Sequence, residues 1–202
     1  MKKAFTLAEV LITLGIIGVV AAMVIPALNN GIQDMKYKTA YKKAYSEALN
    51  VWQFMINENA VETRTSVYEG SIPLVNFKTF MSYFAVSKVC LNVVSACWDL
   101  SGEKINNHIP ASNASQVAFL DNSGRAWLYF DAAYIGDKIY VDINGFELPN
   151  RYGKDRFILL PISSGGSLAG LPIKLAPMGD ILNYDSRYCQ YPPCYYKSWL
   201  YN

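Results

Sequence analysis

Hydrophobic and polar residues are distributed unevenly along the chain, and the longest apolar run lies within the first thirty positions. It extends from Val10 to Leu28 and is interrupted only by one threonine, two glycines and Pro26. A helix of this length crosses a bilayer core of about 30 Å. Lys2 and Lys3 precede the run, and a single carboxylate, Glu9, stands directly before it. The pattern predicts a membrane-spanning helix, and a carboxylate in such a place needs a compensating partner.

Beyond Pro26 the pattern becomes that of an amphipathic helix. Apolar residues recur at spacings of three and four: Tyr37, Tyr41, Tyr45, Ala48, Trp52, Met55 and Ile56. Charged residues fill the other positions: Lys36, Lys38, Lys42, Lys43, Glu47 and Glu58. This spacing predicts a helix that buries one stripe against a globular body and exposes its charges. A proline within a helix distorts it without necessarily ending it, so we expect one helix from Phe5 to about Ala60.

After residue 61 the chain consists of short β-rich runs separated by turn signals. The expected strands are Gln116–Leu120, Arg125–Phe130, Lys138–Ile143 and Arg156–Pro161. Asp121-Asn122-Ser123-Gly124 predicts a hairpin, and Asn144-Gly145 predicts a tight turn. Ser163–Gly179 is rich in glycine, serine and proline, which predicts a long surface loop. We therefore expect an α+β fold, with the long N-terminal helix packed on an antiparallel sheet of about four strands.

Composition narrows the possible partners and the compartment. The 202 residues carry a net charge of +2, too small for a nucleic-acid-binding surface across the whole molecule. Four cysteines form two local pairs, Cys90 with Cys97 and Cys189 with Cys194, and four cysteines allow three connectivities. The spacing within the first pair fits a zinc site poorly. If the body lies outside the cytoplasm, two disulfides are expected.

Three interpretations of the N-terminal segment compete. The first is an ordinary secretory signal cleaved after Val20-Ala21-Ala22, where the small residues suit a signal peptidase. The second is an uncleaved membrane anchor. In the third, cleavage follows Ala4, and Phe5 becomes the first residue of a mature chain that keeps its apolar helix. The ordinary signal leaves Glu9 without a purpose, which favours the third interpretation.

The segment Ala4-Phe5-Thr6-Leu7-Ala8-Glu9-Val10-Leu11, followed by the apolar run, resembles the N-terminal signature of type IV prepilins and pseudopilins. In that family a prepilin peptidase removes a short basic leader and the new N-terminal residue, usually phenylalanine, is N-methylated. The resemblance implies cleavage between Ala4 and Phe5, methylation of Phe5, and a role for Glu9 in recruiting subunits to a filament. The family usually has glycine before the cut, whereas this chain has alanine, which is also small.

The resemblance also implies a domain organisation and a location. Residues 1–4 would be the leader, 5–28 the transmembrane or filament-core helix, 29–61 its amphipathic continuation and 62–202 a β-rich globular domain. The chain would sit in the bacterial inner membrane with one crossing, its globular domain periplasmic, or extracellular once in a filament. Its partners would be other pilin-like subunits, the prepilin peptidase, an inner-membrane assembly platform and membrane lipid. The alternative function is a periplasmic binding protein or enzyme, exported by an ordinary signal or held by an uncleaved anchor.

Catalytic and metal-binding signals are weak, so we expect a structural protein without a cofactor. His108 is the only histidine, and no nucleotide-binding, hydrolase or metalloprotease motif is present. Some pseudopilins bind calcium, but the spacing of Asp142, Asn144 and Asp155 does not match an EF-hand loop, which favours local turn contacts. The aromatic residues around the last cysteine pair are expected to pack the terminal loop. They are Tyr188, Tyr191, Tyr195, Tyr196 and Trp199.

Overall fold

A computed structural model describes residues 6–63, 71–91, 93–103, 117–129, 138–163, 171–179 and 188–201. The chain divides into two compact units, Met1–Lys36 and Tyr37–Asn202. The second unit, here called the body, contains the sheet.

Helix α1 extends from Leu7 to Asn57 and contains Pro26. The expected long helix is therefore confirmed, with its described ends within a few residues of the prediction. In the body, the predicted stripe is the buried face of α1. Tyr41, Ala48, Trp52 and Met55 are fully or almost fully buried, and Ala44 joins them. This burial supplies the stabilisation that the amphipathic half of the helix needs.

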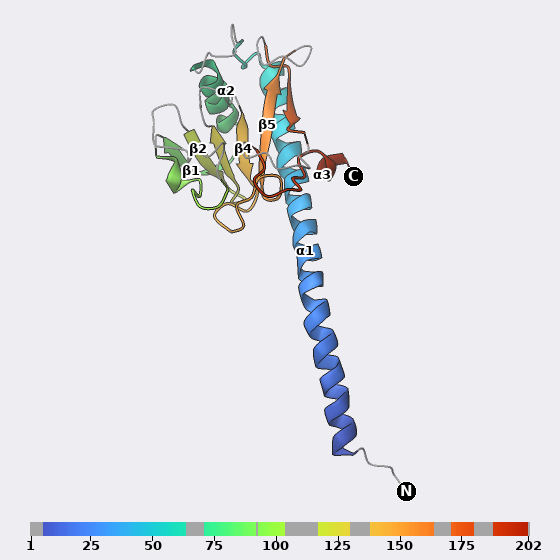
Figure 1. Ribbon diagram of the computed structural model, residues 1–202. Coiled ribbons are helices and arrows are strands. Elements are labelled where there is room, and N and C mark those ends of the chain that lie inside the picture. The colour runs from blue at the N-terminus through green and yellow to red at the C-terminus, as the bar shows by residue number, and fades with distance from the viewer. Residues whose placement is uncertain are drawn as a thin grey trace. The chain divides into compact units, whose positions relative to one another are not determined.

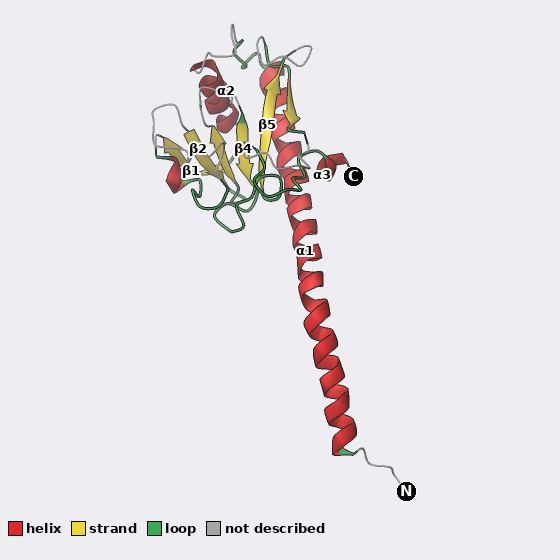
Figure 2. Cartoon of the chain, viewed as in Figure 1, coloured by secondary structure: helices red, strands yellow, loops and turns green. Residues whose placement is uncertain are grey.

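Six strands form one sheet in the described part of the chain, each hydrogen-bonded antiparallel to the next, in the order β1-β2-β3-β4-β5-β6 (Figures 1 and 2). Their bounds are β1 Val86–Leu91, β2 Val117–Asp121, β3 Ala126–Tyr129, β4 Ile139–Asp142, β5 Arg156–Ile162 and β6 Lys174–Pro177. The other elements are α2 Ser71–Ser82, the 3-10 turn η1 Val94–Ala96 and α3 Ser198–Tyr201. The α+β class is confirmed.

Helices α1 and α2 pack in the body through aromatic residues on one face of the sheet. Phe119, Trp127, Val141 and Phe157 lie opposite one another on neighbouring strands, so their side chains share a face. Tyr41 of α1 stacks on Phe157. From α2, Phe77 contacts Phe119 and Phe80 contacts Trp127. This face is the aromatic core of the body.

Loops cover the opposite face of the sheet, where Asp142 and Arg156 are cross-strand partners. Trp98, which follows η1, lies under the Arg156 guanidinium at 4.8 Å, and Tyr152 meets Tyr140 edge-on. The inner strands β2 to β5 are consequently buried on both faces, and β3 and β4 have no exposed residue. The sequence therefore lacks the alternation of polar and apolar residues that a half-exposed strand would show.

Several expectations about the body were wrong. The sheet has six described strands instead of about four, because β1 and β6 were not foreseen. β6 lies inside Ser163–Gly179, which had been assigned to a surface loop. Helix α2 was not predicted either. It buries the polar side chain of Asn76, whose amide is satisfied by two hydrogen bonds with the backbone of Glu62. Glu47, expected on the charged face of α1, is partly exposed there, and it also forms an ion pair with Arg125 that the sequence did not predict.

Both predicted turns are present. Asp121 closes the β2–β3 hairpin, where its Oδ1 accepts hydrogen bonds from the backbone N–H groups of Ser123 and Arg125. Gly124 supplies the positive φ of 84° that this turn requires. Gly145 likewise has a φ of 69°, but the chain does not return directly after it. Residues 143–155, the β4–β5 loop, come before β5.

Candidate functional site

The first turn of α1 holds the carboxylate that the sequence singled out. Thr6 donates from its backbone N–H and from its hydroxyl to Oε2 of Glu9, both at 2.8 Å. The Glu9 N–H donates back to the Thr6 hydroxyl at 3.3 Å. This reciprocal arrangement is a capping box, which satisfies helix-start donors that would otherwise lack partners. The carboxylate is thereby held at the N-terminal end of α1, where the helix dipole favours negative charge.

Sequence reasoning missed Thr6, although the Thr-x-x-Glu spacing before an apolar run is a recognised signal for such a cap. The predicted cleavage and methylation positions, Ala4 and Phe5, lie outside the described residues. Glu9 is therefore the one predicted residue of this site whose surroundings the structure shows.

The apolar segment that follows has no cover within its own unit. Its large side chains are exposed along the described residues from Leu7 to Met35. By length and composition, α1 is one helix able to cross a membrane in the part of the chain that the structure describes. Thr13, the polar residue within the run, donates its hydroxyl to the Val10 carbonyl at 3.0 Å, so its polar group is satisfied by the helix itself. Such a surface needs lipid or other helices around it.

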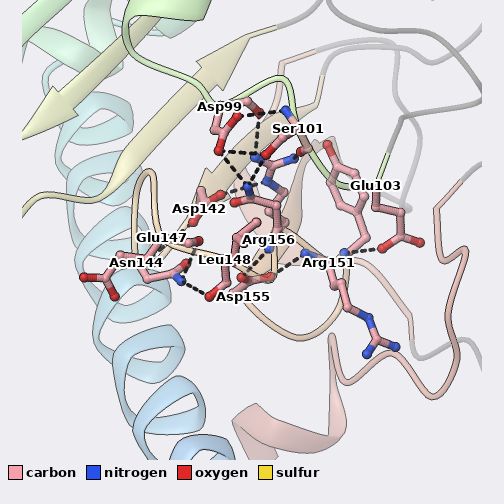
Figure 3. Close-up of polar contacts among 12 residues, drawn as sticks. Asp99, Ser101, Glu103, Asp142, Asn144, Glu147, Leu148, Arg151, Asp155 and Arg156 are labelled. Carbon is pink, nitrogen blue, oxygen red and sulfur yellow. Dashed lines mark hydrogen bonds and ion pairs between the residues drawn. The ribbon is translucent and has the colours of Figure 1, made fainter.

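In the body, a buried polar network joins the strand ends to the covering loops (Figure 3). Its members are Asp99, Ser101, Glu103, Asp142, Asn150, Asp155 and Arg156. Arg156 forms an ion pair with Asp142 at 2.7 Å and donates to the carbonyls of Ser101 and Asp99 at 3.1 and 2.6 Å. The Asn150 amide donates to the Asp99 carboxylate and to the Ser101 hydroxyl. The network thus fixes residues 99–103 against the sheet.

Two further carboxylates of the network bind backbone N–H groups. Asp155 accepts from Asn150 at 2.7 Å and from Arg151 at 2.5 Å. Glu103 accepts from Tyr152 at 2.6 Å and from the backbone N–H of Gln190. Burial raises the pKa of Glu103 to about 7 and also raises the pKa of Asp155, in both cases against the opposing effect of these hydrogen bonds. Through its two hydrogen bonds, Glu103 joins its own segment to the segments that contain Tyr152 and Gln190.

This geometry does not favour calcium at Asp142, Asn144 and Asp155. The Asp142 carboxylate faces the Arg156 guanidinium, and the Asp155 oxygens face backbone donors. The Asn144 amide turns back to the carbonyls of Glu147 and Leu148, as local turn contacts require. Among the described residues, no group of three or more histidine, cysteine, aspartate or glutamate side chains could hold a metal ion.

The sequence left three connectivities open, and the structure has the disulfides Cys90–Cys97 and Cys189–Cys194, with Cα–Cα distances of 5.9 and 6.2 Å. The first joins the turn after η1 to the edge strand β1. The second closes the C-terminal loop, which packs so tightly on Gly153 that a Cβ there would collide with Cys194. Among the aromatic residues of that loop, Tyr196 is buried and Tyr195 stacks on Trp199 at 4.9 Å. The expected packing role is confirmed for these three; Tyr191 is exposed.

His108, the residue with which a catalytic hypothesis would begin, lies outside the described residues. The side chains of the polar network bind one another and the backbone, and these contacts hold the loops on the sheet. The first turn of α1 and the apolar segment after it therefore form the candidate functional site, and their chemistry is that of packing and charge pairing.

Comparisons with known proteins address this same segment. A family model described as the prokaryotic N-terminal methylation motif matches residues 1–25. No curated protein and no solved structure matches the chain. The motif is that of a structural family, and it implies processing by a prepilin peptidase and assembly with pilin-type subunits in general. The apolar helix also fits membrane anchoring. The chain thus carries, at residues 1–25, the N-terminal methylation motif that is the signature of type IV pilins and pseudopilins.

Proposed function

We propose that the chain is a structural subunit, without enzymatic activity, of a filament of the type IV pilus or type II secretion pseudopilus class. The observation that carries the proposal is the combination of the methylation motif with an exposed apolar helix whose first turn presents Glu9. An apolar surface of this kind can be covered by lipid before assembly and by the equivalent helices of neighbouring subunits afterwards.

Charge pairing explains why Glu9 would matter for assembly. Cleavage after Ala4 would create a cationic amine on Phe5, close to the start of the helix. An amine and a carboxylate from neighbouring subunits attract each other far more strongly at low dielectric than in water. Either charge left unpaired in lipid is costly, so pairing favours helix packing. The Thr6 cap gives the Glu9 carboxylate hydrogen-bond partners within its own chain until such an amine is available.

The remaining parts of the proposal concern location and boundaries. The chain would be cut after residue 4 and held in the bacterial inner membrane by residues 5–28, with residues 29–61 continuing the helix and 62–202 forming the globular domain. Two disulfides in the body suit a compartment outside the cytoplasm. The assembly partners would be other pilin-like subunits and an inner-membrane platform. A subunit that uses different surfaces on its two sides generates an open, helical filament.

Mass spectrometry of the native N-terminus tests this proposal against the two alternatives. A chain that begins with methylated Phe5 supports a filament subunit. A chain that begins at Met23 would show cleavage by an ordinary signal peptidase and would overturn the proposal in favour of an exported binding protein or enzyme. An intact Met1 would indicate a permanent anchor and would also contradict it.

A further inference from the structure

The turn that begins the β4–β5 loop contains an asparagine followed by a glycine, Asn144-Gly145. In such a pair the backbone nitrogen of the glycine can attack the side-chain amide carbon of the asparagine, because glycine has no side chain to hinder the approach. A second pair of the same composition, Asn30-Gly31, lies inside α1. The two pairs are chemically identical, so a difference in their reactivity comes from the surrounding fold.

The backbone nitrogen of Gly145 is less restrained than that of Gly31. Within an α-helix each backbone N–H donates to the carbonyl four residues earlier, which holds the Gly31 nitrogen in the helix and away from the preceding side chain. The Gly145 N–H, by contrast, makes no backbone hydrogen bond among the described residues. Asn30 is exposed and Asn144 is partly exposed, so exclusion of water does not protect Asn30. The backbone geometry therefore makes Asn144 the more reactive of the two.

The turn needs both residues of this pair, so the reactive pair is part of the fold. Gly145 has a φ of 69°, and a Cβ there would come within 2.4 Å of the Gly124 carbonyl oxygen. The Asn144 amide donates from Nδ2 to the carbonyls of Glu147 and Leu148 at 2.9 and 3.4 Å (Figure 3). Asparagine supplies these donors, whereas aspartate in its ionised form has none.

We propose that Asn144 is a site of spontaneous deamidation in the folded body. The Gly145 nitrogen loses its proton to water and forms a bond with the side-chain amide carbon of Asn144. The Asn144 Nδ2 then leaves as ammonia, which gives a cyclic succinimide. Water opens this ring at either of its carbonyl groups and leaves aspartate or isoaspartate at position 144. The net reaction consumes water, releases ammonia and involves no oxidation or reduction.

Deamidation loosens the turn that the Asn144 amide holds. A carboxylate offers no donor to the carbonyls of Glu147 and Leu148, and it places a negative charge beside these oxygens. The Asp142 carboxyl group is also close, because its Oδ1 accepts a hydrogen bond from the Asn144 N–H at 3.3 Å. The Leu148 carbonyl accepts a hydrogen bond from the Tyr37 hydroxyl as well, so the loosened turn includes a contact with α1.

Incubation of the purified full-length chain in detergent micelles and mildly alkaline buffer tests the site. Peptide mass spectrometry measures the share of each asparagine that has been converted, and Asn30 is the internal control. We expect Asn144 to convert at least about tenfold faster than Asn30, because the Gly31 nitrogen reacts only when the helix opens locally. In denaturant this difference should disappear. Equal rates in the folded chain, or a difference that persists in denaturant, would overturn the proposal.

Hydrogen exchange of Asn144→Asp, which carries the charge of the product, tests the effect on the turn. We expect the amides of residues 144–148 to exchange faster than in the unsubstituted chain. Asn122→Asp is the matched control, because Asn122 is exposed in the β2–β3 hairpin turn, and it should leave this exchange unchanged. Equal effects of the two variants, or no effect of Asn144→Asp, would overturn the proposed loosening. Deamidation requires neither membrane anchoring nor assembly, so its absence would leave the filament proposal intact.

Discussion

The ring of Tyr41 in α1 stacks face to face on Phe157 of β5, with ring centroids 3.5 Å apart and planes 7° from parallel. The Tyr41 hydroxyl also donates to the Tyr196 carbonyl at 2.8 Å. One side chain therefore connects the long helix, the sheet and the C-terminal segment. The part of α1 that belongs to the body is fixed through this contact.

Replacing Tyr41 with alanine should lower the free energy of unfolding of the body by about 3–5 kcal/mol, because a fully buried ring is lost and a cavity remains. Tyr41→Phe is the matched control. It keeps the stacked ring and removes only the hydrogen bond, at a cost of about 1 kcal/mol. Denaturant unfolding followed by tryptophan fluorescence measures both. Equal losses for the two variants would show that stacking on Phe157 contributes little.

Arg125 makes the second connection between α1 and the sheet. Its guanidinium pairs with buried Asp121 at 2.7 Å and with Glu47 at 2.5 Å. Arg125→Met should destabilise the body by about 3–5 kcal/mol, because it leaves the Asp121 carboxylate buried without its cation. Glu47→Gln should cost only about 0.5–1 kcal/mol, since the Glu47 side chain is 43% exposed. Thermal unfolding measures the stability of both variants. A loss of stability in Glu47→Gln as large as that in Arg125→Met would contradict this ranking.

The stability of the body should fall as the pH rises through neutrality. Burial raises the pKa of Glu103 to about 7 from an ordinary value of 4.5, so the folded state binds this proton more tightly than the unfolded state. That contribution is complete below pH 4.5 and is lost by about pH 7. Burial likewise raises the pKa of Asp142 to about 7 and that of Asp155, with the same sign.

We therefore expect a higher melting temperature near pH 5 than near pH 8, and a smaller difference between them in Glu103→Gln. The variant loses one of three buried titrating carboxyl groups, so its pH slope is reduced without vanishing. The slope is the readout, because a merely structural role of Glu103 would shift both melting temperatures equally. An unchanged slope in Glu103→Gln would show that this carboxyl group does not titrate in the range.

Local periodicity was sufficient to predict the main architecture from sequence. The stripe from Tyr41 to Met55 predicted the buried face of α1, and four β-rich runs predicted β2 to β5. The edge strands could not be found in the same way. β1 is mostly exposed, and β6 lies in a segment of turn-forming composition, so each depends on its neighbouring strand more than on its own residues.

Polar contacts between residues far apart in the chain could not be predicted from the sequence either. The pairing of Glu47 with Arg125 and the convergence of Glu103 on Tyr152 and Gln190 join residues far apart in the chain, and no local spacing encodes them. For the site, the sequence identified Glu9 because a carboxylate at the start of an apolar run is unusual. It also contained the Thr6 cap, which a search for capping boxes would have revealed.

In the proposed function the charge of Glu9 drives the subunit into a filament, and Glu9→Gln removes that charge alone. Glutamine can still accept the hydrogen bonds of the Thr6 cap, so the variant removes the charge and keeps the start of the helix. Thr6→Ala is the complementary control, which weakens the cap and keeps the charge.

The amount of the chain recovered in filaments sheared from producing cells is the measurement. We expect Glu9→Gln to abolish incorporation, although the body should unfold at the same temperature as in the unsubstituted chain. Incorporation of Glu9→Gln at the normal level would contradict this role of Glu9.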